Sequence, residues 1–228
     1  MADFPGMPLG GDESPDLRLP PALPRHEVPV VRATPVSLAG YGVLVDDPNS
    51  YRVELVAWPA LGWRPVDPGT GLGGGLASAR LHVRREGRAL LASDDEGRDD
   101  PARGWTIVGW AERPDEAGAA GPAVILPGAS YRPDGGQLVV PVDPGPYLAV
   151  LARPGDDVGP GDFAGFFVEP GRALSIPPGV WCAAAAAIPA GDGGRFLVRS
   201  GRVRARISCD LREEFGVVLS VPVRPPVP

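Results

Sequence analysis

Lysine is absent from this chain of 228 residues, and histidine is scarce. All 22 basic residues are arginine, and the only histidines are His26 and His82. Schiff-base catalysis, pyridoxal-phosphate attachment and Walker A nucleotide binding all require a lysine, so these functions are excluded. Two histidines exclude a three-histidine metal site, and we expect neither a metal nor another cofactor. Arginine, carboxylate, hydroxyl and thiol groups are therefore left to carry any chemistry.

Long apolar runs and an excess of positive charge are also missing. No stretch of 18 apolar residues occurs, and acidic residues such as Asp3 and Asp12 interrupt the start of the chain. These features predict a cytoplasmic protein without a secretory signal or a membrane span. The net charge of −6 predicts that the protein does not bind nucleic acid, because nucleic-acid phosphates are also negative.

Cysteine is the other rare residue with chemical consequences. Cys182 and Cys209 form no C-x-x-C pattern, which predicts two free thiols rather than a disulfide framework. Cys209 falls on the apolar side of an alternating segment and is expected to be buried.

The chain contains 32 glycines and 30 prolines. Either residue inside a helix lowers the stability of that helix, so long helices are excluded. Short apolar runs alternate with turn sequences such as Asp143-Pro144-Gly145, which predicts an all-β sandwich or barrel. We expect a Pro-rich flexible arm over residues 1–28, one β domain over 29–223 and a short tail over 224–228. The predicted strands include residues 43–45, 53–57, 105–110, 123–126, 138–142 and 147–151.

The last third of the chain carries the clearest local signals. Apolar and polar residues alternate over 202–209, the pattern of a strand with two different faces. Asp210 and Glu213 have the spacing of a capping box for one helical turn, and Gly216 is placed to end it. A final strand is predicted over 217–221. The alanine run 183–187 fits either a short helix or a strand of small residues.

Three further features have a structural interpretation. The glycine-rich segment 71–75 lacks the lysine of a phosphate loop and is interpreted as a turn or lid. The acidic residues over 94–100 lack the spacing of a calcium loop and are interpreted as a solvated loop. His82 is expected on a half-exposed strand. All five tryptophans are expected in the core or in a pocket wall.

Several blocks of the sequence, taken in order, resemble the ureidoglycolate lyase family. The similarity spans about residues 33–222 and depends on the order and spacing of the blocks. It implies a cupin-like double-stranded β-helix barrel of the jelly-roll type, commonly a homodimer, with its pocket inside. The family releases urea from ureidoglycolate to give glyoxylate in allantoin breakdown. The blocks are residues 34–42, 60–71, 131–142, 147–157, 176–181, 196–198, 204–210 and 214–216.

The chain departs from the family where the family's histidines and carboxylate are expected. Arg132, Gly136, Pro177, Cys182 and Arg204 occupy those positions. A cupin-type metal centre cannot be assembled from this set. The resemblance nevertheless implies a pocket near them.

The candidate site follows from these positions. Arg132 is expected to bind a carboxylate, Gln137 to hydrogen bond to the ligand, and Trp181 and Arg204 to complete the substrate site. Cys182 is the candidate acid or base.

Three functions stay open at this point. The first is a degenerate, non-catalytic barrel that binds a small carboxylate or ureide metabolite or serves as a scaffold. The second is an active lyase acting on ureidoglycolate. The third is a different enzyme on the same barrel, for which His82 is a candidate base.

Overall fold

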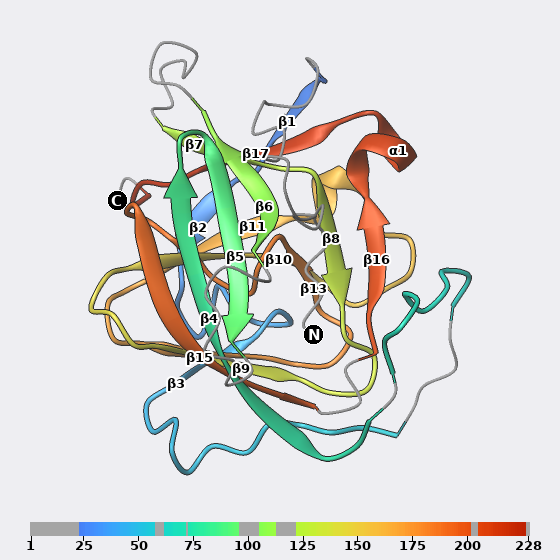
Figure 1. Ribbon diagram of the computed structural model, residues 1–228, viewed down its shortest axis with the longest axis vertical. Coiled ribbons are helices and arrows are strands. Elements are labelled where there is room, and N and C mark those ends of the chain that lie inside the picture. The colour runs from blue at the N-terminus through green and yellow to red at the C-terminus, as the bar shows by residue number, and fades with distance from the viewer. Residues whose placement is uncertain are drawn as a thin grey trace.

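The computed structural model describes residues 23–57, 62–71, 73–95, 105–112, 122–201 and 205–226. In this part the chain forms two mixed β-sheets, one short α-helix and one 3-10 turn, η1 (Pro160–Asp162) (Figure 1). The first sheet has the order β1 (Arg25–Glu27), β17 (Val218–Pro222), β7 (Ala123–Leu126), β6 (Thr106–Ala111), β5 (Ala89–Asp95), β4 (Leu76–Glu86), β15 (Gly193–Gly201), β9 (Gln137–Pro141), β12 (Ala173–Ile176) and β3 (Val43–Val45). The second has the order β16 (Ile207–Asp210), β8 (Gly128–Tyr131), β13 (Trp181–Ala183), β10 (Tyr147–Ala152), β11 (Ala164–Val168) and β2 (Val30–Arg32), with β14 (Ile188–Pro189) also paired to β10.

The prediction of an all-β fold is confirmed. Most strand pairs are antiparallel, whereas β1 pairs with β17, and β2 with β11, in parallel. The described strands form two sheets and do not close into one barrel. Short strands and frequent turns are what the dispersed glycines and prolines favour.

Strand β10 lies in the middle of the second sheet, and one face of this sheet contacts the first sheet. Every residue of β10 is buried. Tyr147 on β10 meets Phe196 on β15 with ring centroids 5.3 Å apart, and its hydroxyl donates to the carbonyl of Arg172, just before β12. The face of the second sheet that carries Tyr147 therefore faces β9, β12 and β15. We call it the inner face.

Helix α1 (Leu211–Phe215) confirms the predicted cap signals. The carboxylate of Asp210 accepts hydrogen bonds from the backbone N–H groups of Arg212 and Glu213. Gly216 ends the helix with φ of 65°, a conformation that glycine adopts without strain. The helix lies between β16 and β17, so it joins the two sheets (Figure 1).

Other expectations are changed by the tertiary structure. Residues 53–57 form a single bridge, between Leu55 and Gly135, rather than a strand. The alanine run begins as β13 and then turns, with Ala184 at a φ of 59°. In the predicted arm, residues 25–27 form β1 and Val28 is 2% exposed, whereas residues 1–22 lie outside the described part.

The tryptophans do not share one environment. Trp110 and Trp181 are buried as expected, but Trp63 is 65% exposed, so the prediction for that residue is wrong. At the surface its ring stacks on the guanidinium of its neighbour Arg64, 4.2 Å away, and its indole N–H donates to the Asp157 carboxylate. Trp105 is partly buried, and Trp58 lies outside the described residues. Of the acidic residues predicted to form a loop over 94–100, Asp94 and Asp95 end strand β5 instead, and those over 96–100 lie outside the described part.

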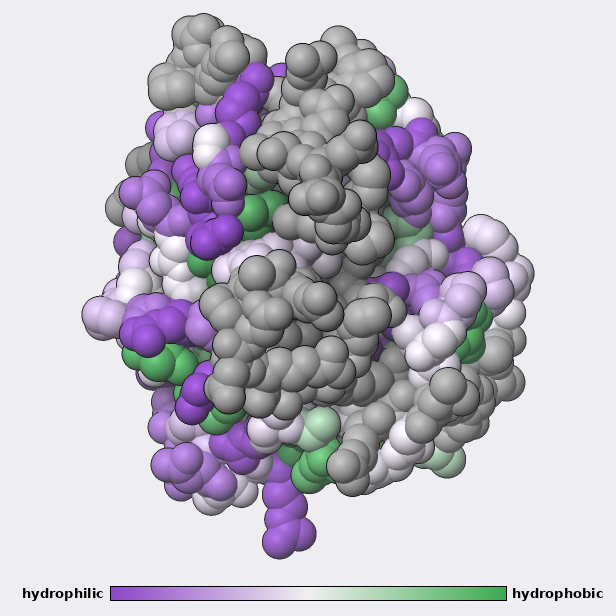
Figure 2. Space-filling model, in the orientation of Figure 1, coloured by the Kyte–Doolittle hydropathy of each residue, from purple (hydrophilic) through white to green (hydrophobic). Residues whose placement is uncertain are grey.

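The described surface is mixed in character. Figure 2 shows hydrophobic residues as separate small areas among hydrophilic ones on the face in view. Among the described helices, none is long and apolar enough to cross a bilayer. Cys182 and Cys209 are both free, as predicted from their spacing, and both are buried.

Candidate functional site

Two crossovers between the sheets bring candidate residues to the same end of the molecule. Strand β8 ends at Tyr131 and the chain then enters β9 at Gln137. Strand β15 ends at Gly201, and β16 begins at Ile207. Strands β9 and β15 pair here through Gln137 and Ser200. The sequence separation between these residues therefore says little about their separation in space.

On the second sheet, Cys182 shares the inner face with small polar residues. Cys182 pairs with Ser130, and Ser130 pairs with Ser208, which gives a row across three strands. Cys182 also pairs with Leu151, which alternation places on the same face as Tyr147. Arg132 comes directly after the end of β8. The positive charge of Arg132 acts on the Cys182 thiol.

On the first sheet, Gln137 and Ser200 face this row. They are paired with each other and share the face of Val139 and Phe196, which belong to the core between the sheets. Ser200 is 5% exposed, and Gln137 is partly buried. We call this set the inner polar site: Ser130, Arg132, Gln137, Cys182 and Ser200.

Three members of the inner polar site are unpaired. In the described part of the chain, the side chains of Ser130, Gln137 and Ser200 make no hydrogen bond to protein. None of their polar atoms is among the fully buried side-chain atoms that lack a partner, so water or a ligand can reach these groups. Arg132 provides a cation beside them.

Cys182 is a weakly acidic member of this site. Burial raises the pKa of its thiol to about 12, and the charge of Arg132 only partly opposes this effect. Since the thiolate is the reactive form, Cys182 is a neutral thiol near pH 7. In this geometry its contribution is to shape and hydrogen bonding.

Trp181 points to the opposite face of the sheet from Cys182. Its indole N–H donates to the carbonyl of Gly155 at 2.7 Å, and its ring meets the edge of Tyr131 at 4.6 Å. It is fully buried. Trp181 thus supports the strand that carries Cys182 from behind, and the two neighbours do not line one surface.

Arg64 covers Trp181 on that opposite face. Its guanidinium lies 5.5 Å from the Trp181 ring, donates to Glu214 at 2.5 Å and donates to the Asp156 carbonyl at 3.0 Å. Cys209, 1% exposed, also lies against Arg64 and Glu214. Burial, with the nearby carboxylate, raises the pKa of this thiol to about 12. The prediction that Cys209 is buried is confirmed.

Asp134 is a candidate that the sequence pattern presented only as a turn residue. It is 6% exposed, and its burial raises the pKa of its carboxyl, an effect opposed by its own backbone N–H and by Arg132.

A second missed residue, Arg206, directly precedes β16. The alternation over 202–209 is the signal that placed Arg206 and Ser208 on one face.

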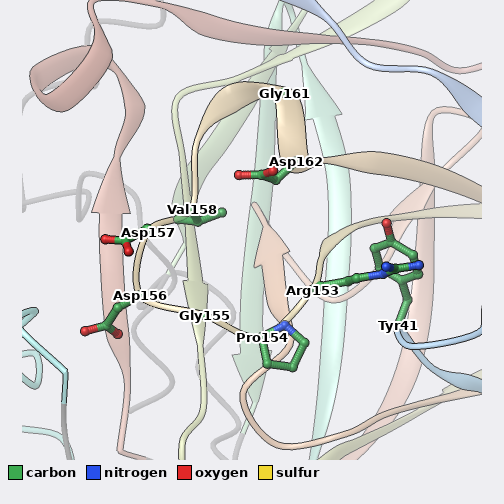
Figure 3. Close-up of a pocket in the computed structure, with 9 residues that line it drawn as sticks. All are labelled: Tyr41, Arg153, Pro154, Gly155, Asp156, Asp157, Val158, Gly161 and Asp162. Atoms are coloured by element: carbon green, nitrogen blue, oxygen red, sulfur yellow. The ribbon is translucent and has the colours of Figure 1, made fainter.

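A surface pocket of about 440 Å³ lies at the same end of the second sheet. It is lined by Tyr41 and the loop 153–162, which includes Asp156, Asp157 and Asp162. Arg153 lies over the Tyr41 ring at 5.2 Å, and Figure 3 shows both on the side away from Asp156 and Asp157. The pocket is therefore polar, with its charges of opposite sign on different sides.

The remaining candidates lie elsewhere. Arg204 falls outside the described residues. His82 is partly buried on β4, as expected, in register with Arg195, five residues along β15 from Ser200. His26 on β1 is in register with Leu219, so neither histidine belongs to the inner polar site. Within the described ranges no group of three or more metal-ligating side chains occurs.

The chain was also compared with known proteins. No protein-family model matches it, and no curated protein is significantly similar to it.

Proposed function

We propose that this protein binds a small carboxylate-bearing metabolite at the inner polar site, within a cupin-like fold related to ureidoglycolate lyases. Arg132 holds the carboxylate, because a guanidinium pairs with a carboxylate through two parallel hydrogen bonds. Gln137, Ser130 and Ser200 bind the rest of the molecule. Cys182 forms part of the wall.

The observation that carries the proposal is the set of unpaired polar side chains beside Arg132. The Ser200 hydroxyl, in a residue 5% exposed, and the partly buried Gln137 amide make no hydrogen bond within the described part of the chain. A ligand with several oxygen atoms can hydrogen bond to such groups in place of water. The partial exposure of Arg132 and Gln137 gives the ligand access.

The proposal is tested by calorimetric titration and thermal unfolding with glyoxylate, glycolate and ureidoglycolate. Wild-type protein is expected to bind at least one of these acids saturably. Arg132→Gln is expected to abolish that binding. Arg172→Gln is the matched control, since Arg172 is 45% exposed and pairs with Asp46 at 2.8 Å on the surface. Absence of binding to wild type, or equal binding by both variants, contradicts the proposal.

Lyase activity on ureidoglycolate is a second candidate, and Asp134 is the observation that favours it. The reaction removes the hydroxyl proton as the carbonyl of glyoxylate forms, breaks the C–N bond and returns a proton to the urea nitrogen. A buried carboxyl with a raised pKa beside Arg132 is the type of group that exchanges such protons. It takes the place of the histidines that this site lacks.

Glyoxylate release, measured against the spontaneous decay of ureidoglycolate, tests this candidate. Asp134→Asn is expected to remove the enzymatic rate while binding is retained. Asp143→Asn, which alters a surface carboxylate paired with Arg195, is expected to leave it unchanged. A wild-type rate equal to the spontaneous one rejects the lyase and leaves the binding function in place.

A homodimer belongs to the same proposal, because the resemblance implies one. Light scattering coupled to size-exclusion chromatography measures it directly, with a mass of twice 23.7 kDa expected. A mass of one chain at micromolar concentration contradicts it.

A further inference from the structure

Arg206 and Arg132 flank the last paired residues of β16 and β8 at one end of the second sheet. The ladder between β16 and β8 ends where Ile207 pairs with Tyr131. Arg206 precedes Ile207 and Arg132 follows Tyr131, so one arginine adjoins each of these paired residues. Since Ser208 and Ser130 are also paired, alternation places Arg206 on the inner face with Ser208.

The Arg206 side chain is held on one side only. Its Nε donates to Asp67 at 2.5 Å, and the same carboxylate oxygen accepts the Ser208 hydroxyl at 2.6 Å. Backbone bonds also join Arg206 to the segment around Asp67: the Asp67 N–H donates to the Arg206 carbonyl, and the Arg206 N–H donates to Thr70 Oγ1. The orientation of this guanidinium is therefore fixed before any ligand arrives.

The other side of the guanidinium has a free donor. The Nη1 atom of Arg206 is buried and donates to no group among the residues that the structure describes, and the whole side chain is only 13% exposed. A buried N–H of a charged group without an acceptor is costly, and hydrogen bonds to charged groups are the stronger ones. The geometry therefore favours an acceptor oxygen next to Arg206, in addition to a carboxylate at Arg132.

We infer that Arg206 is a specificity-determining residue that recognises a second acceptor oxygen of the ligand, close to the carboxylate held by Arg132. The ligand class is then a short 2-oxo, 2-hydroxy or 2-amido acid, and a simple aliphatic acid is a poor ligand. Asp67 is a positioning residue, because it acts through Arg206. This inference rests on the proposed function, whose carboxylate site it extends.

The test compares two acids of similar shape by calorimetric titration. Oxamate carries a second acceptor oxygen next to its carboxylate, whereas isobutyrate carries methyl groups there. Wild-type protein is expected to bind oxamate at least about tenfold more tightly, the factor expected for one charge-assisted hydrogen bond. Arg206→Lys keeps the charge and the pairing with Asp67 but loses the Nη donors, so it is expected to bind the two acids equally.

Controls separate this inference from the proposed function. Arg212→Lys alters a similar arginine, paired with Asp210 at 2.6 Å beyond the other end of β16, and is expected to retain the preference for oxamate. Asp67→Asn is expected to weaken that preference. Equal binding of both acids by wild type, or a preference that survives Arg206→Lys, overturns the role of Arg206 alone. Failure of wild type to bind oxamate overturns this inference, whereas the proposed function is decided separately by the titrations with glyoxylate, glycolate and ureidoglycolate.

Discussion

Replacing Arg64 with alanine tests the packing behind the candidate site. Arg64 is 4% exposed and joins three parts of the chain: Glu214 on α1, the Asp156 carbonyl on the 153–162 loop, and the ring of Trp181 on β13. The substitution removes two charge-assisted hydrogen bonds, each worth about 1.5–3 kcal/mol. It also removes cation–π contacts worth roughly 0.5–2 kcal/mol.

The net loss is smaller than the sum of these contributions. Glu214 is 30% exposed, so water partly solvates its carboxylate once the arginine is gone. We therefore expect Arg64→Ala to lower the free energy of unfolding by about 3 kcal/mol, within the range for breaking a buried pair. For a chain of this length that corresponds to a fall in Tm of about 6–12 °C. Urea denaturation followed by tryptophan fluorescence measures the loss.

An exposed ion pair provides the control. Arg32 pairs with Glu169 at 2.6 Å, but the two side chains are 52% and 49% exposed. Arg32→Ala is expected to cost about 0–1 kcal/mol, as is usual for surface pairs. If Arg64→Ala costs no more than Arg32→Ala, the argument that burial makes the Arg64 contacts strong is refuted.

The same pair predicts a pH dependence. The hydrogen bond from Arg64 lowers the pKa of Glu214 in the folded protein. A carboxyl with a depressed folded-state pKa stabilises the fold above its unfolded value of about 4.3, and this stability is lost as the pH falls through the folded value. The difference in unfolding free energy between wild type and Arg64→Ala should therefore shrink below about pH 4. A difference that grows on acidification contradicts the assignment.

Three further predictions concern single residues. Asp210→Ala removes two hydrogen bonds to the first turn of α1 and is expected to cost about 1 kcal/mol in chemical denaturation; no loss would mean that the cap is not needed. Gly42→Ala places a Cβ 2.6 Å from the Ser175 carbonyl oxygen and is expected to lower Tm clearly, whereas an unchanged Tm would show that β3 can shift. Cys182 and Cys209 are expected to react with a thiol reagent only on unfolding, since burial raises both pKa values to about 12, and rapid labelling of the native protein would contradict this.

Part of the candidate site could be predicted from local signals. Alternation over 202–209 placed Arg206 and Ser208 on one face, and the capping residues fixed α1. Resemblance brought Arg132 and Cys182 to attention as replacements for expected histidines, and Gln137 as a residue that matches the family pattern. The charge of Arg132 acts on the Cys182 thiol, and Gln137 lies on a strand of the other sheet.

Trp181 shows where sequence proximity misleads. It is adjacent to Cys182, yet successive strand residues point to opposite faces, so its ring meets Tyr131 and Arg64 instead. Asp134 shows the converse. In the sequence it is an ordinary turn residue, and only its burial at the crossover from β8 to β9 makes its carboxyl a candidate for proton transfer.

The sequence by itself determined the class of fold and the available chemistry. Frequent glycine and proline limit the chain to short elements, and the absence of lysine with only two histidines leaves arginine as the main cationic group. These are properties of residue type and spacing, which need no tertiary contacts. Only the tertiary structure decided which of the 22 arginines lie together, because β16, β8 and β13 become neighbours through pairing between residues up to about 80 positions apart in the chain. Their neighbours and burial, rather than their identity, distinguish Arg132 and Arg206 as candidate ligand groups and Arg64 as a support of the fold.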